Sequence, residues 1–391
     1  MSLSADTRKH RARFLGLSIS VLLVIGLLVI GLVLLVHQQR SGDEPVDRAE
    51  KAAASTMPPI RHVFVINIEN KGFRTTWGSR SAAPYLAKTL RAKGVLLSQY
   101  HGTAHHSLGN YVAQISGQGP SYAIQHDCPV FTRFKETGEP RKPGQVYGNG
   151  CVYPKKVRTL AGQLVNAGYT WRGYMQDMAR PCQHSRLGHH ERWRVATKRQ
   201  QYATRHNPFM YFRSIIGRPA YCKQHVKPLS VLPGDLKRSS STRSLSYITP
   251  DLCHDAHNRR CADGGPGGLR AANKWFRAWV PQILRSPAFR ADGMLVITAD
   301  ESEGVKEDSR ACCGEGAGPN AGQPGIDGPG GGRIGALVIS SFVRPGTTTR
   351  TPYNHYSLLG SIEDLFGVER LGYARTVTTT FGDDVYNAYI G

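Results

Sequence analysis

The chain has 391 residues, of which 40% are hydrophobic, so it is long and apolar enough to form one large α/β domain or two smaller ones. Lysine and arginine number 50 against 28 acidic residues, which gives a formal net charge of +22. This excess disfavours cationic partners and indicates anionic ones: phosphate esters, lipid headgroups, cell-wall polymers or nucleic acid. No motif points to specific nucleic-acid recognition, and the dense basic runs 186–199 and 237–243 are equally typical of a solvated surface.

Residues 14–36 form an uncharged apolar run that is long enough to cross a bilayer, since a span needs about 20 apolar residues. Four basic residues precede the run, whereas only Arg40 follows it before two acids. This asymmetry predicts that residues 1–13 are cytoplasmic and that the folded part lies outside the membrane. A cleaved signal peptide is the alternative, but the run exceeds the usual apolar core and no A-x-A site follows it. We therefore expect a single-pass membrane anchor at 14–36.

Residues 37–60 are polar, alanine-rich and proline-bearing, which predicts a linker before a folded domain at 61–391. All eight cysteines fall within this domain, and none shows the C-x-x-C spacing of a metal site. Disulfides are expected, because an exported domain lies in an oxidising compartment. Proximity in sequence favours three pairs and leaves one adjacent pair, with the connectivity still open: Cys128 with Cys151, Cys182 with Cys222, Cys253 with Cys261, and Cys312 beside Cys313.

The domain alternates strand and helix patterns along its length. The clearest strand is 62–68, a near-continuous apolar run that is typical of a central parallel strand buried on both faces. Alternation of this kind indicates a doubly wound, mostly parallel sheet with helices on both faces. The further elements expected are strands at 94–100, 169–175, 244–249, 294–298 and 334–342, and helices at 82–93, 111–117, 157–167, 268–284 and 355–366.

Two segments lack this alternation. Residues 176–240 are rich in histidine, arginine and aromatic residues but have weak periodicity, so we expect a cap-like insertion near the site. Residues 302–332 include a glycine-rich stretch without the G-K-[ST] ending of a phosphate-binding loop. We expect a mobile loop there instead of a phosphate cradle.

Polar residues follow four of the predicted strands. Ligands of doubly wound sheets bind beyond the carboxyl ends of the strands, so these residues are expected at one edge. Carboxylates, an amide, an imidazole and a hydroxyl around one point suit a hard or borderline divalent cation. One acid at a strand end is commonly a helix cap or loop charge, but four segments together favour a site. The residues concerned are Glu69, Asn70, Ser107, Asp255, His257, Asp300 and Glu301.

Ser107 lies in a strand-to-helix turn between the strand at 94–100 and the helix at 111–117. A hydroxyl at a helix N-terminus faces unpaired backbone N–H groups and the positive end of the dipole, which favour its alkoxide and any phosphate it attacks. The alternative is an N-cap without chemistry. A serine esterase is not indicated, because residues 105–109 are H-H-S-L-G instead of G-x-S-x-G.

Eight ordered motifs across most of residues 61–370 resemble the bacterial phosphoesterase family of acid phosphatases and phospholipases C. That family belongs to the alkaline-phosphatase-like superfamily, and its resemblance implies the same α/β fold. The motifs are HVFVINIENKGF (62–73), HHSLGNYVAQISGQ (105–118), DCPVF (127–131), AGYTWRGYMQDM (167–178), HNPFMYF (206–212), PDLCHDAH (250–257), LVITADE (295–301) and HYSLLGSIEDLFG (355–367).

The resemblance implies a role for each matching residue. It makes Ser107 the nucleophile and Asn110 a donor to a phosphate oxygen. The metal ligands that it implies are Glu69, Asn70, Ser107, Asp300 and Glu301, with Asp255 as a further ligand. His257 and His355 become acid/base groups or ligands, and His106 and His206 become contacts for the substrate. The chain departs from the family pattern at His106 and Gly109, where proline is common, and at Asn258, where an acid is common.

The resemblance therefore implies metal-dependent hydrolysis of phosphate esters through a phosphoserine on Ser107, as in acid phosphatases that act on monoesters. The divalent metal itself is not identified by the sequence. One alternative is a phosphodiesterase or phospholipase C that acts on phospholipid headgroups. The other is a non-catalytic surface protein that binds an anionic lipid or cell-wall polymer, which the net charge alone would explain.

Overall fold

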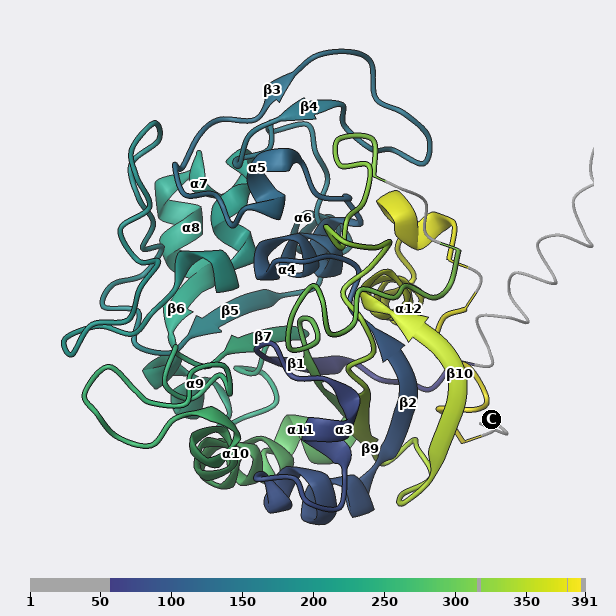
Figure 1. Ribbon diagram of the computed structural model, residues 1–391. Coiled ribbons are helices and arrows are strands. Elements are labelled where there is room, and N and C mark those ends of the chain that lie inside the picture. Colours follow the sequence, from purple (N-terminus) through teal and green to yellow (C-terminus); the bar gives the residue numbers. More distant parts are fainter. Residues whose placement is uncertain (1–56, 315–317, 378, 388–391) are drawn as a thin grey trace, which may run out of the picture. The chain divides into compact units, whose positions relative to one another are not determined.

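A large central sheet organises the computed structural model, which describes residues 57–314, 318–377 and 379–387 (Figure 1). Two short strands, β3 (Lys135–Glu136) and β4 (Gly148–Asn149), form a separate ribbon. The eight strands of the main sheet are β1 (His62–Ile68), β2 (Val95–His101), β5 (Trp171–Met175), β6 (Val226–Pro228), β7 (Leu245–Thr249), β8 (Gly293–Ala299), β9 (Ala336–Ser340) and β10 (Thr348–Asn354).

The strand order is β10-β2-β9-β8-β1-β7-β5-β6. Every neighbouring pair is parallel except those of β9, which runs antiparallel to both β2 and β8. Strand β1 lies between β8 and β7, where Val63 is in register with Met294 and Leu245. The predicted mostly parallel sheet is thus confirmed, while the reversed direction of β9 was not predicted.

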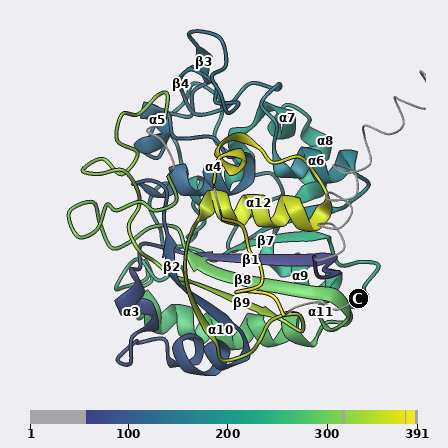
Figure 2. The same ribbon diagram turned by 90° about the vertical axis from the view of Figure 1, so that its right-hand side faces the viewer.

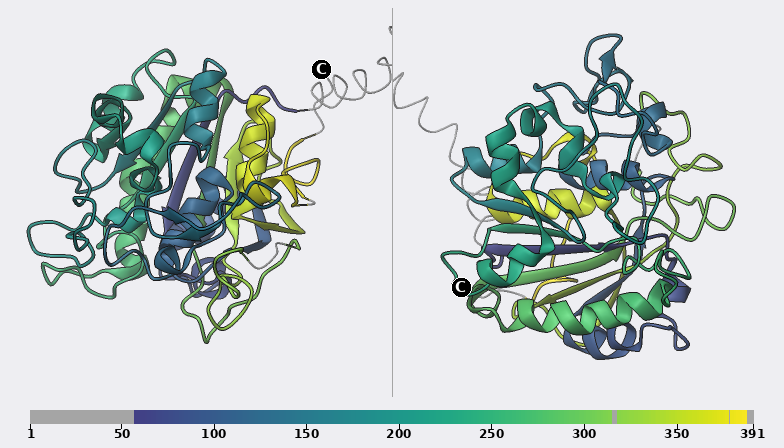
Figure 3. Two further views of the ribbon diagram at one scale, coloured as in Figure 1. Left: turned by 90° about the horizontal axis from the view of Figure 1, so that it is seen from above. Right: turned by 90° about the vertical axis from the view of Figure 1, so that its left-hand side faces the viewer.

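Helices cover both faces of the sheet, as expected. Helices α4, α6 and α12 lie over one face and α10 and α11 over the other (Figures 2 and 3). The helical segments are α3 (Phe73–Trp77), η1 (Tyr85–Leu90), η2 (Arg91–Lys93), α4 (Ser107–Ser116), α5 (Tyr122–Gln125), α6 (Leu160–Asn166), η3 (Thr204–His206), η4 (Pro208–Tyr211), α7 (Arg213–Ile216), α8 (Pro219–His225), η5 (Leu229–Val231), α9 (Leu232–Asp235), α10 (Gly268–Arg285), α11 (Pro287–Asp292), α12 (His355–Phe366) and η6 (Gly372–Arg375).

The sequence accounts for why these elements pack as they do. Strands β5, β7, β8 and β9 are buried along their whole length, as continuous apolar runs require. Helix α10 buries Leu269, Ala272, Phe276, Val280 and Ile283, which recur at three- and four-residue spacing and form one face. Helix α4 ends at Gly117, whose φ of 67° is the left-handed conformation that glycine adopts without strain.

Several elements differ from the prediction. The helix expected at 82–93 is a π-helical turn, η1, followed by the 3₁₀ turn η2. Strand β10 was not predicted, because its sequence TTRTPYN is polar and contains Pro352. It lies at the edge of the sheet, where a proline is tolerated since one side of the strand needs no ladder hydrogen bonds.

The segment 176–240 is built of short helical turns joined by irregular chain. Its strand β6 pairs in parallel with β5, with Gly173 opposite Val226. Part of this segment therefore extends the main sheet as an edge strand, and the cap-like role of the rest stays a prediction.

The predicted membrane anchor at 14–36 and the cytoplasmic segment 1–13 lie outside the described residues, so both stay predictions. Within residues 57–314, 318–377 and 379–387, no helix is long and apolar enough to cross a membrane. The compact unit that carries the sheet begins at Pro58.

The three disulfides favoured by sequence proximity are present, and the two remaining cysteines also pair. Three connect segments separated by 8 to 40 residues: Cys128–Cys151, Cys182–Cys222 and Cys253–Cys261. The fourth joins the neighbours Cys312 and Cys313. The chain has eight cysteines, and none of them is free.

We expect the unfolded, unreduced protein to show no reactive thiols in a titration, and eight after reduction. Reduction should also lower the unfolding temperature, since the Cys182–Cys222 link alone is worth about 4 kcal/mol by the loop-entropy relation. A sample kept oxidised throughout is the control. More than two thiols before reduction would contradict the oxidised assignment.

Candidate active site

Three acidic loops are tied together at the carboxyl edge of the sheet. Glu69 follows β1 directly, and Asp300 follows β8 directly. The backbone N–H of Asp300 donates to the carbonyl of Ile68 at 2.9 Å, and that of Glu69 donates to the carbonyl of Asp255 at 2.6 Å. These bonds extend the ladder past the strands, so the three carboxylates are held on neighbouring positions.

Ser107 is the first residue of α4 and is buried, with 4% of its surface exposed. Its Oγ donates a hydrogen bond to Glu69 Oε2 at 2.8 Å. The following backbone amide, Leu108 N, donates to Asp127 Oδ1 at 2.9 Å. The serine therefore lies at a helix N-terminus with its hydroxyl turned toward Glu69, the carboxylate that follows β1. This contact links the predicted nucleophile to the predicted acidic cluster.

The acids form a buried cluster of like charge. Asp255, Asp300 and Glu301 are at most 1% exposed, and burial followed by repulsion from neighbouring carboxylates raises the pKa of each carboxyl well above its ordinary value. Burial also opposes ionisation of Glu69, but the charge and hydrogen bond of His206 outweigh it and lower the pKa of Glu69 to about 2. The cluster as a whole therefore requires positive charge nearby.

His206 and Tyr111 supply part of that environment. His206 Nε2 lies 3.1 Å from Glu69 Oε2, and His206 Nδ1 lies 3.8 Å from Asp255 Oδ2. The imidazole stacks on the ring of Tyr111 at 5.5 Å, and the Tyr111 hydroxyl donates to Glu69 Oε1. His206 was expected to contact the substrate, but the structure places it, 1% exposed, among the carboxylates.

The other side of the cluster is built around Glu301. The side-chain amide of Asn70 donates to Glu301 Oε1, while the Asn70 backbone N–H donates to Asp300 Oδ1 at 2.8 Å. His105 Nδ1 lies against Glu301 Oε2, and its Nε2 lies 3.1 Å from the carbonyl of Asp308. His105 was not among the predicted residues, although it precedes Ser107 by only two positions.

The donor set fits a divalent cation. Three oxygens of this cluster, Asn70 Oδ1, Asp255 Oδ2 and Asp300 Oδ2, are buried and have no hydrogen-bond partner within the described chain. Buried polar atoms are nearly always satisfied, so such oxygens are commonly ligands of an ion. Carboxylate and amide oxygens are the donors that hard divalent cations prefer, and a cation would stabilise the ionised acids.

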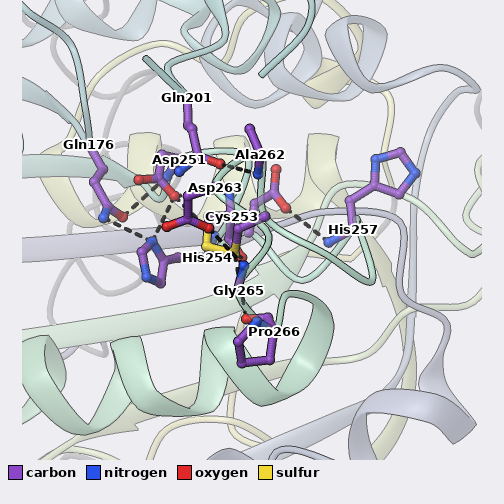
Figure 4. Close-up of a disulfide and its surroundings, with 12 residues drawn as sticks. Gln176, Gln201, Asp251, Cys253, His254, His257, Ala262, Asp263, Gly265 and Pro266 are labelled. Carbon is purple, nitrogen blue, oxygen red and sulfur yellow. Dashed lines mark hydrogen bonds and ion pairs between the residues drawn. A yellow bond between two sulfur atoms is a disulfide. The ribbon is translucent and has the colours of Figure 1, made fainter. Parts of the chain in front are cut away.

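A second group of potential ligands, Asp251, Cys253 and His254, does not fit a metal (Figure 4). Cys253 is bonded to Cys261 and has no thiolate to offer. Asp251 Oδ1 accepts from the backbone N–H groups of Cys253 and His254, both at 3.0 Å, and lies 2.7 Å from His254 Nδ1. These contacts make a hydrogen-bonded turn, in which the carboxylate is already occupied.

A cavity of about 360 Å³ opens onto Ser107. Of the predicted residues, Asn70, Glu301, His106 and His257 also line it. The structure adds two arginines: Arg205 Nε lies 3.6 Å from Asp127 Oδ2, and Arg205 Nη1 donates to the carbonyl of Arg194 at 2.7 Å. Arg194 itself lines the cavity and is exposed. The cavity is therefore lined by guanidinium groups as well as by carboxylates.

His257 and His106 are exposed at this cavity. The backbone N–H of His257 donates to Asp255 Oδ1 at 2.9 Å, so the loop that carries the imidazole is fastened to the acidic cluster. An exposed imidazole beside the serine can exchange a proton with a bound ester or with water. Both imidazoles, His106 and His257, are therefore accessible from the cavity.

His355 has a different environment from the one expected. It is fully buried, with Nε2 2.6 Å from the backbone carbonyl of Asp300 and Nδ1 3.1 Å from both Tyr100 Oη and Gln114 Nε2. Burial lowers the pKa of His355 to about 4, so the ring is neutral at pH 7. The expected acid/base or ligand role stays a prediction, while these contacts fasten His355 to the loop that carries Asp300.

Asn110 also differs from its expected role as a phosphate donor. Its Oδ1 accepts from the backbone N–H groups of Thr103 at 2.8 Å and Ala104 at 3.0 Å, and its Nδ2 donates to the carbonyl of Ala104 at 2.8 Å. The residue is fully buried. The loop packs closely against α4 here, because a Cβ at Gly109 would lie 2.8 Å from the Cβ of Ala104. Asn110 therefore shapes the turn that presents Ser107.

Asn110→Ala should lower the free energy of unfolding by about 2–4 kcal/mol, because two buried N–H groups and a carbonyl lose their partner. Denaturant unfolding measures this loss, and Asn320→Ala is the control. Asn320 makes comparable bonds, to Gly148 N and the Val146 carbonyl, in a half-buried loop. An Asn110→Ala protein of unchanged stability with a raised KM would instead support the phosphate-donor role.

A hydroxyl, a buried acid cluster and guanidinium groups at the carboxyl edge of an α/β sheet define an enzyme site for an anionic substrate. The chain belongs to the phosphoesterase family, whose sequence model matches residues 76–369. It is therefore a hydrolase of phosphate esters, and the non-catalytic alternative is not supported.

Two curated relatives and one solved structure are similar to the chain. A phosphatidylinositol-3-phosphatase of Mycobacterium tuberculosis is 25% identical over 85% of this chain and 86% of its own length. An acid phosphatase of Aspergillus fumigatus is 23% identical over 87% of this chain, which spans 65% of that protein. A structure from Vibrio parahaemolyticus, in the alkaline phosphatase superfamily, matches 81% of this chain and 68% of its own at 11% identity and a TM-score of 0.47. The family assignment does not depend on that structural likeness.

Most of the site residues that the sequence analysis did not predict lie in or next to motifs that it recognised. Asp127 begins the motif DCPVF, Arg205 precedes HNPFMYF, and His105 and Tyr111 belong to the motif around Ser107. Their positions in these motifs were a usable signal for Asp127, His105 and Tyr111. Arg194 lies in the dense basic run 186–199, where composition alone cannot separate one arginine from its neighbours.

Proposed function

We propose that the protein hydrolyses phosphate monoesters through a phosphoserine on Ser107, with the help of a divalent cation. The observation that carries this proposal is the hydrogen bond of 2.8 Å from Ser107 Oγ to Glu69 Oε2, within a cluster of buried acids whose free oxygens lack partners. Glu69, Asn70, Asp255, Asp300 and Glu301 are the residues that would hold the cation, with Ser107 Oγ beside them.

A bound divalent cation supplies Lewis-acid chemistry, which lowers the pKa of the hydroxyl and neutralises charge on the phosphate. The residues of the chain account for the rest. Ser107 Oγ, held by its hydrogen bond to Glu69 Oε2, releases its proton to solvent in the cavity and forms a bond to phosphorus as the ester P–O bond breaks; Oγ takes up a proton again when water hydrolyses the phosphoserine. His257, exposed at the cavity, gives a proton to the departing alcohol and then takes one from the water that hydrolyses the phosphoserine.

The cavity at Ser107 favours a monoester over a diester. Arg194 and Arg205 line it; Arg205 is paired with Asp127, whereas Arg194 makes no ion pair within the described residues. A phosphate monoester carries close to two negative charges at neutral pH, whereas a diester carries one. Guanidinium pairs with phosphate through charge-assisted hydrogen bonds, and the second charge adds to this attraction. A comparison of the rates on a monoester and a diester tests this preference against the phosphodiesterase or phospholipase C alternative.

The purified protein should hydrolyse p-nitrophenyl phosphate with kcat/KM at least about tenfold above that for bis(p-nitrophenyl) phosphate, a difference of about 1.4 kcal/mol. Chelation should abolish both activities, and added divalent cation should restore them. A chelator already saturated with calcium is the control for nonspecific effects. Faster hydrolysis of the diester would establish the alternative, and activity that survives chelation would remove the metal from the proposal.

A further inference from the structure

A basic pocket of about 790 Å³ adjoins the active site and has no part in the chemistry proposed above. Its permanent cations are Arg180, Arg186, Arg192 and Lys223. None of these four side chains takes part in an ion pair within the part of the chain that the structure describes. Their charges are therefore uncompensated by the protein, as in sites that receive an anion.

The wall of the basic pocket contains no acid. Three histidines, His184, His189 and His190, line it together with the cations. The one acid of this stretch, Glu191, is 7% exposed and points inward, where its Oε1 accepts from Ser185 Oγ at 3.0 Å and from Thr204 Oγ1 at 2.9 Å. The segment thus buries its negative charge, and no carboxylate lies among the described residues that line the pocket.

A disulfide fixes the pocket's shape. Cys182, which lines the pocket, is bonded to Cys222 in α8, and Lys223 follows Cys222 directly. The backbone N–H of Cys182 also donates to the carbonyl of Val226 at 3.0 Å. The loop with Arg180 and the helix with Lys223 are therefore held together before any ligand binds. Such preorganisation reduces the entropy that binding must overcome.

The basic pocket and the catalytic cavity share a wall. Arg192 and Trp193 line the basic pocket, while the next two residues, Arg194 and Val195, line the cavity at Ser107. The chain segment 192–195 therefore borders both hollows. This arrangement suits a ligand with two anionic groups, one on each side of the segment.

We propose that the basic pocket is a second anion subsite, which holds a further phosphate or carboxylate on the leaving group of the substrate. This inference rests on the proposed function, because it takes Ser107 as the point of attack on the first phosphate. The substrate class is then a phosphate monoester with at least one more anionic group. That group belongs either to a soluble polyphosphate ester or to a lipid headgroup at a membrane surface, and both present the same chemistry.

The test removes three of the cations, in the variant Arg180→Gln/Arg186→Gln/Lys223→Gln. The matched control, Lys237→Gln/Arg238→Gln/Arg270→Gln, removes as many exposed cations away from both hollows. Calorimetry of inositol hexakisphosphate binding to the full-length chain with Ser107→Ala avoids turnover. The pocket variant should bind inositol hexakisphosphate about tenfold or more weakly, because each basic residue near an anionic surface contributes appreciably to the free energy of binding. Loss no greater than in the control would overturn the proposal.

Two further measurements distinguish the sources of the anion. The first introduces the three pocket substitutions into the protein with Ser107 intact. If the ligand is soluble, these substitutions should lower kcat/KM for glucose 1,6-bisphosphate about tenfold more than kcat/KM for glucose 6-phosphate. If the ligand is a lipid, the fraction of the pocket variant that sediments with phosphatidylcholine vesicles containing phosphatidylinositol phosphate should fall by a similar factor. Either loss supports the subsite. If both losses are absent, the subsite proposal is overturned. If the wild type hydrolyses no phosphate ester, the proposed function fails, while the calorimetry still decides on the pocket.

Discussion

Replacing Ser107 with alanine should reduce kcat for a phosphate monoester by at least about three orders of magnitude, as for nucleophiles that act as one unit with their partners. The fold should survive, because Ser107 contributes one hydrogen bond, to Glu69, and Cβ remains to fill the space. Most of the affinity for a divalent cation should remain as well, since the carboxylates around it are unchanged. Steady-state kinetics, denaturant unfolding and a metal titration measure the three quantities.

The control for this variant is Ser116→Ala, at the opposite end of the same helix. Ser116 is also buried, and its Oγ donates to the carbonyl of Val112 at 2.8 Å, so its loss tests the effect of removing a hydroxyl from α4. Labelled phosphate should be trapped by acid on the wild type and on Ser116→Ala only. If Ser107→Ala keeps more than about a tenth of wild-type activity, a deficit under about 1.4 kcal/mol, Ser107 is a helix cap and a water is the nucleophile.

Asp300→Asn should separate the role of charge from that of hydrogen bonding. Asparagine keeps an oxygen that can accept from Asn70 N, so the backbone contact at 2.8 Å can persist. The carboxylate charge and the unpartnered Oδ2 are lost, and a neutral amide is a poorer ligand for a divalent cation. We expect metal affinity to fall at least about tenfold, which removes about 1.4 kcal/mol of metal-dependent stabilisation, and activity to fall with it.

In a chelator, by contrast, Asp300→Asn should be at least as stable as the wild type, because it removes one of several buried like charges. Thermal unfolding with and without divalent cation measures both the loss of metal-dependent stabilisation and the stability without metal, and it does not depend on turnover. Asp263→Asn, in an exposed loop, is the matched control. A variant whose unfolding temperature still rises with metal as in the wild type would exclude Asp300 as a ligand.

The two variants should therefore be distinguishable without knowledge of the natural substrate. Ser107→Ala should lose rate and keep the metal response, whereas Asp300→Asn should lose both. If both keep the metal response, the cation is held without Asp300, and the free oxygens of Asn70 and Asp255 are the next ligands to test.

Local sequence was sufficient to predict most strands and the edge at which the site forms. A buried parallel strand has to be apolar on both faces, so 62–68 and 294–298 were visible as continuous runs. The first polar residues after such runs, Glu69 and Asp300, necessarily fall at the carboxyl edge. The cysteine pairs were also accessible, because short separations favour closure.

The direction of individual strands and their pairing with distant strands could not be predicted from local sequence. Strand β9 is as apolar as its neighbours, so its pattern could not reveal that it runs antiparallel to β2 and β8. Strand β10 is polar because it lies at an edge, and its pairing with β2 depends on a contact across more than two hundred residues.

The sequence by itself therefore determined an α/β domain with a serine and several acids at one edge of its sheet, since burial and strand ends leave a local signature. Only the tertiary structure decided what each polar group faces. Asn110 and His355 turned inward to hold the loops of Ser107 and Asp300, while Arg205 reached the cavity from a segment with no clear periodicity. The physical reason is that hydropathy reports whether a residue is buried, whereas its hydrogen-bond partner is set by chain segments far away in sequence.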